Sequence, residues 1–437
     1  MKHTLIFLLA GLMLAGLCSC VTRPTQINSD WRPNDLKTDL TSTSLQVKRV
    51  ENLPDDFIFG MDASCVPALE ASGVTYTDFD GQVKDVYEIL RANGINYIRV
   101  RIWNHPFTAD GKGYGGGNCD LQNAIEIGRR AAKYGMKLLV NFHYSDFWAD
   151  PAKQMPPKAW QGMSVDQKSE AIYQYTKDAL TALVDAGADV GMVQVGNETN
   201  GAMCGEYASA PNGWQHITQL MQAGARAVRE VCPHALVVLH FANPEKVGSY
   251  ENYGKQLALY GVDYDVFASS YYPYWHGSLD HLANVLNHIS DTYGKKVMVA
   301  ETSYAYTSLD TDYYGNTIDA GGGVAGYPLT LQGQADMVRD VTDTVVNKMH
   351  NGIGIFYWEG TWISVGGKDY ASNLAIWEKH GSGWASSYAG EYDPHDAGKW
   401  YGGCAVDNQA FFDRNGKVTE AIKVFGLMKN GNNPDSK

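Results

Sequence analysis

The stretch VGMVQVGNE, residues 190–198, joins a short apolar run to a polar pair. The run from Val190 to Gly196 has the length and the β-branched content of a buried strand, and Asn197 and Glu198 follow it directly. Seven further runs of this kind occur along the chain: Phe57 to Asp62, Ile95 to Trp103, Met136 to His143, Ala235 to Phe241, Tyr264 to Tyr272, Lys296 to Ala300 and Ile353 to Trp358. Eight such runs predict a closed (β/α)8 barrel, with a doubly wound sheet as the alternative.

The segments between these runs have helical length and helical apolar spacing, as in Leu121 to Tyr134, Asp166 to Ala186, Trp214 to Val231 and Leu331 to His350. Polar and aromatic side chains fall at or just after the predicted strand ends: Asp62, Trp103, His143, Glu198, His240, Tyr272, Glu301 and Trp358. The strand ends of a (β/α)8 barrel share one face, which carries the active site, so this placement favours the barrel. We predict one α/β domain over residues 51–430, a single (β/α)8 TIM barrel with elaborated βα loops, and a tail over 431–437.

Composition narrows the class of partner. The 437 residues include 35 Lys and Arg against 48 Asp and Glu, which gives a net charge of -13. This charge repels a phosphate backbone, so we expect no nucleic-acid partner. With 44% hydrophobic and 19% charged residues the chain can bury a large core. Aromatic residues reach 12%, and their flat faces suit sugar rings.

The amino terminus has the pattern of an export signal. Met1 to His3 precede an apolar run from Leu5 to Leu17, which is too short to span a membrane comfortably. The sequence Leu-Cys-Ser-Cys at 17–20 resembles a bacterial lipobox, which predicts a signal peptide over 1–19, lipidation of Cys20 and a tether over 20–50. We expect an exported protein held at the outer membrane or cell surface only by this lipid. The alternative is a periplasmic or secreted protein in which Cys20 is incidental.

Two glutamates stand at strand ends suited to catalysis. Glu198 closes the fourth run and Glu301 closes the seventh. Cleavage of a glycosidic bond takes one carboxylic acid that protonates the leaving oxygen and a second carboxylate that attacks. We predict Glu198 as acid/base, with a pKa raised by burial and by the charge of Glu301, and Glu301 as nucleophile. Asn197 fits a donor to the sugar 2-hydroxyl. Either glutamate alone would more simply be a solvated loop residue, but the two together favour function.

Seven strings between about residues 54 and 428 resemble family 53 of the glycoside hydrolases, the endo-β-1,4-galactanases. They are GMDASCVPALEASGV at 60–74, INYIRVRIWNHP at 95–106, GYGGGNCDL at 113–121, FHYSDFWADPAKQ at 142–154, VGNETNG at 195–201, AETSYAYT at 300–307 and GCAVDNQAFFD at 403–413. The resemblance implies a retaining endo-hydrolase of β-1,4-galactan, such as the side chains of type I arabinogalactan. It also implies Glu198 as proton donor and Glu301 as nucleophile.

Further side chains are candidates for the walls of the site. Arg99 and Arg101 lie two apart in a strand and therefore project to the same side. We expect Arg101 to orient Glu301, and Arg99 to satisfy a buried carboxylate such as Asp62. The other predicted sugar-binding residues are Asp62, Arg101, Trp103, His143, Tyr144, Asp146, Trp148, His240, Tyr272, Trp275, Trp358 and Trp362. Tyr272 could donate to Glu301, and Trp358 resembles the tryptophan beneath the -1 sugar in the clan. Each aromatic could instead be core packing.

A loop after Glu301 predicts a metal site. Asp310, Asp312, Tyr314 and Asn316 alternate there beside a glycine, and alternating oxygen donors suit calcium. Some members of the family that the chain resembles bind Ca2+ at this loop and clamp it to a segment that matches Cys404 to Asp407. This chain departs from that pattern, because Tyr314 and Cys404 could offer only main-chain carbonyls. We expect a structural Ca2+ and no organic cofactor; the alternative is a solvated turn.

These observations predict a monomeric, retaining endo-hydrolase of β-1,4-galactan. One rival is the same mechanism on another β-1,4 polymer, such as a mannan or xylan. A second is a non-catalytic glycan-binding lipoprotein on the same barrel, against which the presence of both Glu198 and Glu301 argues. A metal-dependent hydrolase is disfavoured because no His-x-His or paired ligand set falls at the strand ends.

Overall fold

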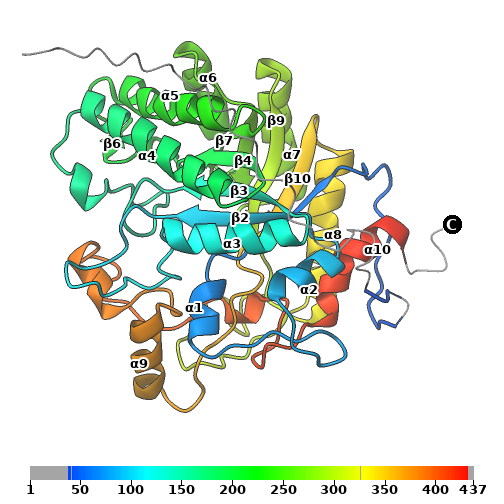
Figure 1. Ribbon diagram of the computed structural model, residues 1–437. Coiled ribbons are helices and arrows are strands. Elements are labelled where there is room, and N and C mark those ends of the chain that lie inside the picture. The colour runs from blue at the N-terminus through cyan, green and yellow to red at the C-terminus, as the bar shows by residue number, and fades with distance from the viewer. Residues whose placement is uncertain (1–37, 41, 325, 432–437) are drawn as a thin grey trace, which may run out of the picture.

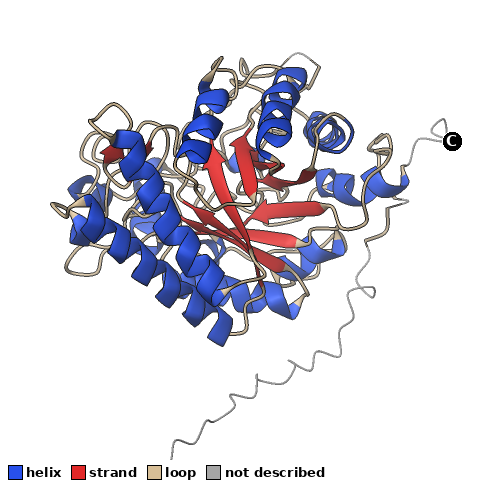
Figure 2. Cartoon of the chain, turned by 90° about the horizontal axis from the view of Figure 1, so that it is seen from above, coloured by secondary structure: helices blue, strands red, loops and turns tan. Residues whose placement is uncertain are grey.

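The computed structural model describes residues 38–40, 42–324 and 326–431. Parallel strands close into a barrel in the order β1-β10-β9-β8-β7-β4-β3-β2, and Figure 2 shows helices surrounding them. The strands are β1 (Ile58–Asp62), β2 (Tyr97–Ile102), β3 (Lys137–Phe142), β4 (Val190–Val195), β7 (Leu236–Phe241), β8 (Val266–Ser270), β9 (Lys296–Thr302) and β10 (Gly352–Tyr357). The predicted (β/α)8 barrel is confirmed, and each strand coincides with one of the predicted runs to within about two residues at either end.

Helices connect successive strands on the outside of the barrel (Figure 1). They are α1 (Val66–Ala71), α2 (Val86–Ala92), α3 (Leu121–Lys133), α4 (Val165–Asp185), α5 (Gly213–Val231), α6 (Ser249–Leu259), α7 (Leu279–Tyr293) and α8 (Leu331–Asn347), with α9 (Tyr370–His380) and α10 (Val424–Asn430) near the carboxyl terminus. The predicted helical segments correspond to α3, α4, α5 and α8. Polar caps set where helices begin: Asp120 accepts from the Asn123 amide at the start of α3, and Ser164 and Gln167 form a capping box on α4.

The barrel interior changes from apolar to polar along the strands. One cluster of buried side chains fills its lower part: Ile58, Leu139, Met192, Val238, Val266, Ala268, Met298, Ala300 and Phe356. Because alternate residues of a strand face the same side, Leu139 on β3 is followed inward by Asn141 and, just past the strand, by His143. The same alternation points Arg99 and Arg101 of β2 inward. The apolar floor therefore supports a polar layer at the carboxyl ends of the strands.

The loops that follow β9 and β10 are the longest βα connections near the cavity. Residues 303–330 join β9 to α8, and residues 358–423 follow β10 and include α9. Figure 1 shows α9 beside α1, so the chain returns across the mouth of the barrel toward its beginning. These two loops, rather than the strands, build one wall of the cleft described below.

The predicted tether over residues 20–50 is wrong for its last part. Leu45, Val47 and Val50 are each at most 2% exposed and belong to the main hydrophobic core. The amide of Val50 donates to the carbonyl of Met428 at 2.9 Å, which ties this segment to α10. Leu45 and Val47 lie two residues apart in extended chain, so their side chains point to the same side and pack on the apolar surface of the barrel. The folded domain therefore begins before residue 51.

The predicted signal peptide and the lipidation site at Cys20 lie outside the described residues. Within the described part of the chain, no helix is both long enough and apolar enough to cross a membrane.

Candidate active site

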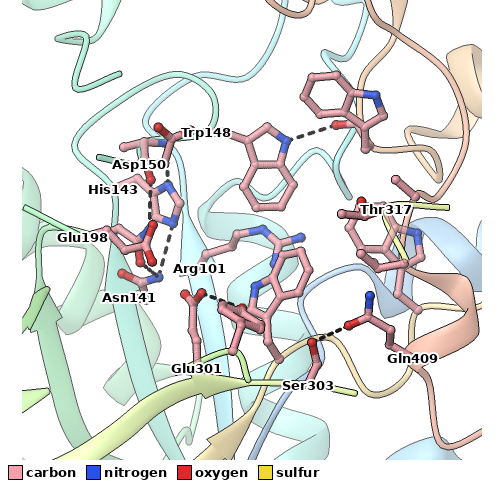
Figure 3. Close-up of a pocket in the computed structure, with 18 of the residues that line it drawn as sticks. Arg101, Asn141, His143, Trp148, Asp150, Glu198, Glu301, Ser303, Thr317 and Gln409 are labelled. Atoms are coloured by element: carbon pink, nitrogen blue, oxygen red, sulfur yellow. Dashed lines mark hydrogen bonds between the residues drawn. The ribbon is translucent and has the colours of Figure 1, made fainter. Parts of the chain in front are cut away.

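A cavity of about 430 Å³ opens at the carboxyl ends of the strands (Figure 3). Its walls include many of the predicted site residues: Arg101, His143, Trp148, Asn197, Glu198, Tyr272, Trp275, Glu301, Tyr314, Trp358 and Trp362. Figure 3 shows the carboxyl groups of Glu198, from the turn after β4, and Glu301, from β9, projecting into the same space. The barrel therefore brings the two predicted catalytic glutamates together.

Glu198 sits in a turn that follows β4. Its φ of 47° is left-handed, which is uncommon for a residue with a side chain, and Gly196 just before it has a φ of 85°. Ser270 Oγ donates to Glu198 Oε1 at 2.6 Å. Burial, then the negative charge of Glu301, raise the pKa of Glu198 to about 8, against a smaller lowering by the Ser270 hydrogen bond. A carboxyl group with this pKa holds its proton at neutral pH, as a general acid must.

Glu301 ends β9 and is 7% exposed. Arg99 Nη1 lies 2.7 Å from Glu301 Oε1, and Tyr272 Oη donates to Glu301 Oε2 at 3.0 Å. Both contacts favour the charged carboxylate, and the predicted donation from Tyr272 is present. The expectation that Arg101 orients Glu301 is wrong, because Arg99 makes that contact. Arg99 also pairs with Asp62 at 3.1 Å, so one guanidinium bridges the two carboxylates.

Arg101 is instead paired with two other buried carboxylates, Asp62 and Glu359. Its guanidinium carbon lies 4.3 Å from the centre of the Trp148 ring, which lines the cavity. Glu359 follows Trp358 directly, is 1% exposed and has a left-handed φ of 48°. Glu359 was not among the predicted site residues. Its position in the sequence could have indicated its role. Glu359 directly follows the strand-end Trp358, and the two inward arginines of β2 require anionic partners inside the barrel.

Asn197 lines the cavity and is held by polar contacts from three strands. Its Oδ1 accepts from Arg99 Nη2 at 2.9 Å, from Asn141 Nδ2 at 3.1 Å and from Gln194 Nε2 at 3.0 Å. Its Nδ2 donates to the carbonyl of Ala149 at 2.9 Å. Because an arginine only donates, the contact with Arg99 fixes which end of the Asn197 amide is oxygen. The amide nitrogen is therefore the end that remains to meet a sugar hydroxyl.

Five predicted sugar-binding residues do not line this cavity. Asp62, Trp103, Tyr144, Asp146 and His240 are each at most 1% exposed, and they act behind its wall. Asp62 pairs with the two arginines. Trp103 donates from Nε1 to His143 Nδ1 at 3.2 Å, and Tyr144 bonds to the Thr176 hydroxyl. The strand-end position of these residues was read correctly, but the alternation of side chains and the loop geometry turn them away from the opening.

The two remaining members of that group also have structural partners. Asp146 accepts from the amides of His105 and Lys158 at 3.0 and 2.8 Å, which joins two loops. His240 Nε2 lies 2.9 Å from Ser270 Oγ, one contact removed from Glu198. Neither residue faces the space that a sugar would occupy.

Aromatic side chains form much of the remaining wall. Trp148 stacks on Trp362 with ring centres 6.4 Å apart and an angle of 16°, and Trp358 packs edge-on against Trp362. Trp275 is 53% exposed at the rim. Tyr274, in the loop after β8, accepts from the Ala305 amide and stacks on Tyr304, so it packs against the loop after β9.

Several residues of the cavity wall were not predicted: Asn141, Asp150, Lys153, Ser303, Thr317, Trp384, Asp396, Ala405, Val406 and Gln409. Lys153 Nζ lies 2.9 Å from Asp393 and 2.5 Å from Asp396, which links the loop after β3 to the loop after β10. Only Asn141 had a usable signal, because it lies two residues before His143 on the same strand face. The others come from loops without a periodic pattern.

The predicted calcium ligands are only partly assembled. Carboxylate oxygens of Asp310, Asp312 and Asp407 lie within 4.8 Å of one another. Asn316 Oδ1 and Asp407 Oδ1 are buried and have no hydrogen-bond partner among the described residues. These unpaired oxygens beside clustered carboxylates fit a hard cation such as Ca2+.

The side chains of Tyr314 and Cys404 are engaged elsewhere. Tyr314 Oη accepts from Trp384 Nε1 at 2.5 Å, and Cys404 Sγ lies 3.9 Å from the carbonyl of Trp362. Cys404 contributes its amide to Asp312 Oδ2 at 2.8 Å. Neither side chain reaches the carboxylate cluster as a ligand. This agrees with the expectation that Tyr314 and Cys404 could offer only main-chain carbonyls.

Known proteins resemble the chain over three quarters of its length or more. It is 50% identical over 435 residues, 99% of both chains, to a Bacillus subtilis (strain 168) protein named endo-beta-1,4-galactanase. It is 34% identical to an arabinogalactan endo-beta-1,4-galactanase of Cellvibrio japonicus, covering 75% of this chain and 86% of that one. Among solved structures, the GH53 catalytic domain of Ignisphaera aggregans matches with a TM-score of 0.77 and 36% identity, covering 88% of this chain and 99% of that one. The sequence model of glycosyl hydrolase family 53 matches residues 58–425, and the chain therefore belongs to that family.

Proposed function

We propose that this protein is a retaining endo-hydrolase of β-1,4-galactan, including type I arabinogalactan. The observation that carries the proposal is the pairing of Glu198 and Glu301 in one cavity with opposite environments. Burial and a neighbouring charge keep a proton on Glu198, whereas Glu301 receives hydrogen bonds from Arg99 and Tyr272. Membership of family 53 and the similarity to named galactanases support the substrate.

The reaction runs by double displacement. Glu198 protonates the glycosidic oxygen while Glu301 attacks the anomeric carbon, which leaves a galactosyl ester on Glu301 and releases the leaving chain. Water then attacks the same carbon, with Glu198 now taking its proton, and the ester bond to Glu301 breaks. Two inversions return the original β configuration. Asn197 is placed to contact the 2-hydroxyl, and the Trp358 face to support the reacting sugar.

A polysaccharide panel tests the substrate. We expect release of reducing ends from β-1,4-galactan at a rate well above that from mannan or xylan, and an early β anomer in proton NMR spectra of the products. Preference for mannan or xylan would overturn the galactan proposal while leaving the mechanism intact. An early α anomer would overturn the double displacement.

Variants test the roles of the two glutamates. Glu301→Ala is expected to abolish turnover, and Glu198→Ala to lower kcat/KM on galactan by about 100-fold or more. Glu230→Gln, on an exposed carboxylate that pairs with Lys177, is the matched control and should keep full activity. Unchanged turnover in Glu301→Ala would refute its role as nucleophile, whereas an unaltered protein that binds galactan without cleaving it would favour a glycan-binding protein.

We also propose a structural calcium ion held by Asp310, Asp312, Asp407 and Asn316, with main-chain carbonyls near Tyr314 and Cys404. The unpaired oxygens of Asn316 and Asp407 support it. The ion would stiffen the loop after β9 against the 404–407 segment and take no part in the chemistry.

We further propose that the chain is exported and anchored by a lipid on Cys20. The apolar run from Leu5 to Leu17 and the Leu-Cys-Ser-Cys sequence at 17–20 support this. Cys20→Ser is expected to move the protein from the membrane fraction to the soluble fraction of a bacterial host and to prevent labelling by a fatty acid. Membrane attachment that survives this change would contradict the anchor.

A further inference from the structure

One carboxyl oxygen of Glu198, Oε1, ends a line of buried polar groups. Ser270, on β8, donates to Glu198 Oε1 at 2.6 Å. Behind it, His240 Nε2 of β7 lies 2.9 Å from Ser270 Oγ, and His240 Nδ1 lies 3.1 Å from Gln194 Nε2. Ser270, His240 and Gln194 are fully buried, and none of them lines the cavity. Only Ser270 contacts Glu198 directly, and the other two reach it through Ser270.

The direction of each hydrogen bond follows from the partners at the far end. Arg99 Nε donates to Gln194 Oε1 at 3.2 Å, and since arginine has no acceptor, Gln194 must turn its Nε2 toward His240. His240 Nδ1 also lies 3.2 Å from Asn197 Oδ1, but that oxygen already accepts from Arg99, Asn141 and Gln194. A fourth donor at that oxygen is disfavoured, so Nδ1 carries no proton and in a neutral ring the proton is on Nε2. Gln194 Nε2 is the donor that faces Nδ1, and it divides its two protons among Nδ1, Asn141 Oδ1, Asn197 Oδ1 and the Gly196 carbonyl.

The imidazole is neutral at working pH. Burial first, then the positive charge of Arg99 and the neighbouring His143, hold the pKa of His240 well below its ordinary value. With Nε2–H donating to Ser270 Oγ, the single hydroxyl proton of Ser270 can point only to Glu198 Oε1. All three bonds thus run one way, from Gln194 through His240 and Ser270 to the carboxyl group.

We propose that Gln194, His240 and Ser270 form a directed chain of hydrogen-bond donors that keeps Glu198 Oε1 an acceptor and so places the acidic proton on Glu198 Oε2, the oxygen facing the substrate. The three are positioning residues, and the inference rests on the proposed role of Glu198 as acid/base. The chain stabilises the ionised carboxylate as well, which serves the second half of the reaction, where Glu198 is a base.

Removal of the last donor has a consequence that simple damage to the fold lacks. In Ser270→Ala, Oε1 loses a hydrogen bond that favours the ionised form, so the pKa of Glu198 rises further. Because a hydrogen bond to a charged group is stronger than one to a neutral group, the basic limb of the kcat/KM profile should move up by about one pH unit or more. Other charged or titratable groups around Glu198 and His240 stay in place: Arg99, His143, Asp150, Tyr250, Tyr272 and Glu301.

A second readout compares leaving groups. A weaker acid slows galactan cleavage, which needs protonation of the leaving oxygen, by about ten-fold. An aryl β-1,4-galactobioside with a nitrophenol leaving group departs without that proton, so its kcat/KM should change less than about two-fold. Equal losses on both substrates would indicate general damage to the site and would overturn the proposal.

Ser269→Ala is the matched control. Ser269 is the same residue type, equally buried and adjacent on β8, but its hydroxyl bonds to Tyr250 Oη at 2.6 Å and not to Glu198. Its basic limb should coincide with that of the unaltered enzyme. An equal shift in Ser269→Ala, or an unshifted limb in Ser270→Ala, would refute the chain.

The unaltered enzyme supplies a test that does not depend on a variant folding. In ¹⁵N-histidine NMR spectra, with the His240 signal assigned by its loss in His240→Gln, we expect the neutral Nε2–H tautomer from pH 5 to 8. The Nδ1–H tautomer, or a protonated ring near pH 6, would refute the directed chain. This result is independent of the proposed function, whose own failure would show as full turnover in Glu198→Ala.

Discussion

At the scale of single residues, the acid/base pair sets the pH range of activity. The pKa of Glu198 is raised to about 8, by burial first and then by Glu301, and the reaction needs its protonated form. Activity is therefore present below this pH and is lost as pH rises through about 8. The basic limb of kcat/KM on galactan, measured between pH 5 and 10, should have its midpoint there. A midpoint below about pH 6 would contradict the assignment of Glu198 as the acid.

The contact between Arg99 and Glu301 gives a second residue-scale prediction. The guanidinium group of Arg99 contacts Glu301, Asp62 and Asn197 at the same time. Arg99→Lys replaces it by a single ammonium group, which cannot make all three contacts. We expect kcat to fall by about 100-fold, because the nucleophile and Asn197 lose shared alignment. Arg339→Lys, on the surface of α8, is the control and should have little effect. Steady-state kinetics with circular dichroism separates lost activity from lost fold, and wild-type kcat in folded Arg99→Lys would refute this role.

The two arginines also show what the sequence could and could not predict. Their spacing correctly placed both side chains inside the barrel. Which one meets Glu301 depends on strand register and on a partner from a distant loop: β1 and β2 pair Asp62 with Arg99, and Glu359 from beyond β10 takes Arg101. Neither the register nor the loop contact leaves a local pattern. The prediction that Arg101 orients the nucleophile failed for that reason.

At the scale of elements, the strands and the longer helices followed from the sequence because burial imposes a period on them. The barrel strands appear as short continuous apolar runs, and α3, α4, α5 and α8 appear as apolar residues at helical spacing. The loops after β9 and β10 obey no such period, yet they supply Trp384, Asp396 and Gln409 to the cavity. Loop residues are positioned by individual tertiary contacts, such as the Lys153 pairing with Asp393 and Asp396, and these are invisible in a local window.

The proposed calcium ion belongs to this scale, because it would join the loop after β9 to the 404–407 segment. Removal with EDTA should lower Tm by at least about 3 °C, and added Ca2+ should restore it, since an ion that binds only the folded state stabilises by mass action. Asp407→Asn should abolish this response, as it weakens a ligand whose Oδ1 is unpaired. Asp413→Asn, in a turn after the segment, is the control. A Tm indifferent to EDTA in the unaltered protein would contradict the site.

At the scale of the whole molecule, the barrel interior is filled by a polar layer above an apolar one, and the two have different roles. Toward the carboxyl ends of the strands, buried charges of β1, β2, β9 and the segment after β10 neutralise one another around the reacting groups. Below them, the apolar cluster that includes Leu139 and Phe356 excludes water. Such an arrangement fixes dipoles before the substrate arrives, which is how an enzyme stabilises developing charge without reorganising solvent.

The amino-terminal segment completes the molecule on the side of α10, and its contribution can be measured. A chain that begins at residue 51 lacks Leu45, Val47 and Val50, all buried, together with the Val50 bond to Met428 and the Ser44 bonds to Glu420. Burial of each aliphatic side chain contributes about 1.5–3 kcal/mol, so the free energy of unfolding should fall by about 3 kcal/mol or more. A chain that begins at residue 38 keeps these contacts and is the matched comparison. We expect the chain that begins at residue 51 to melt several degrees below the one that begins at residue 38. Both should keep the same pH profile, because the active site lies on the loops at the carboxyl ends of the strands. Equal melting of the two truncated chains would mean that residues 45–50 serve only as a tether.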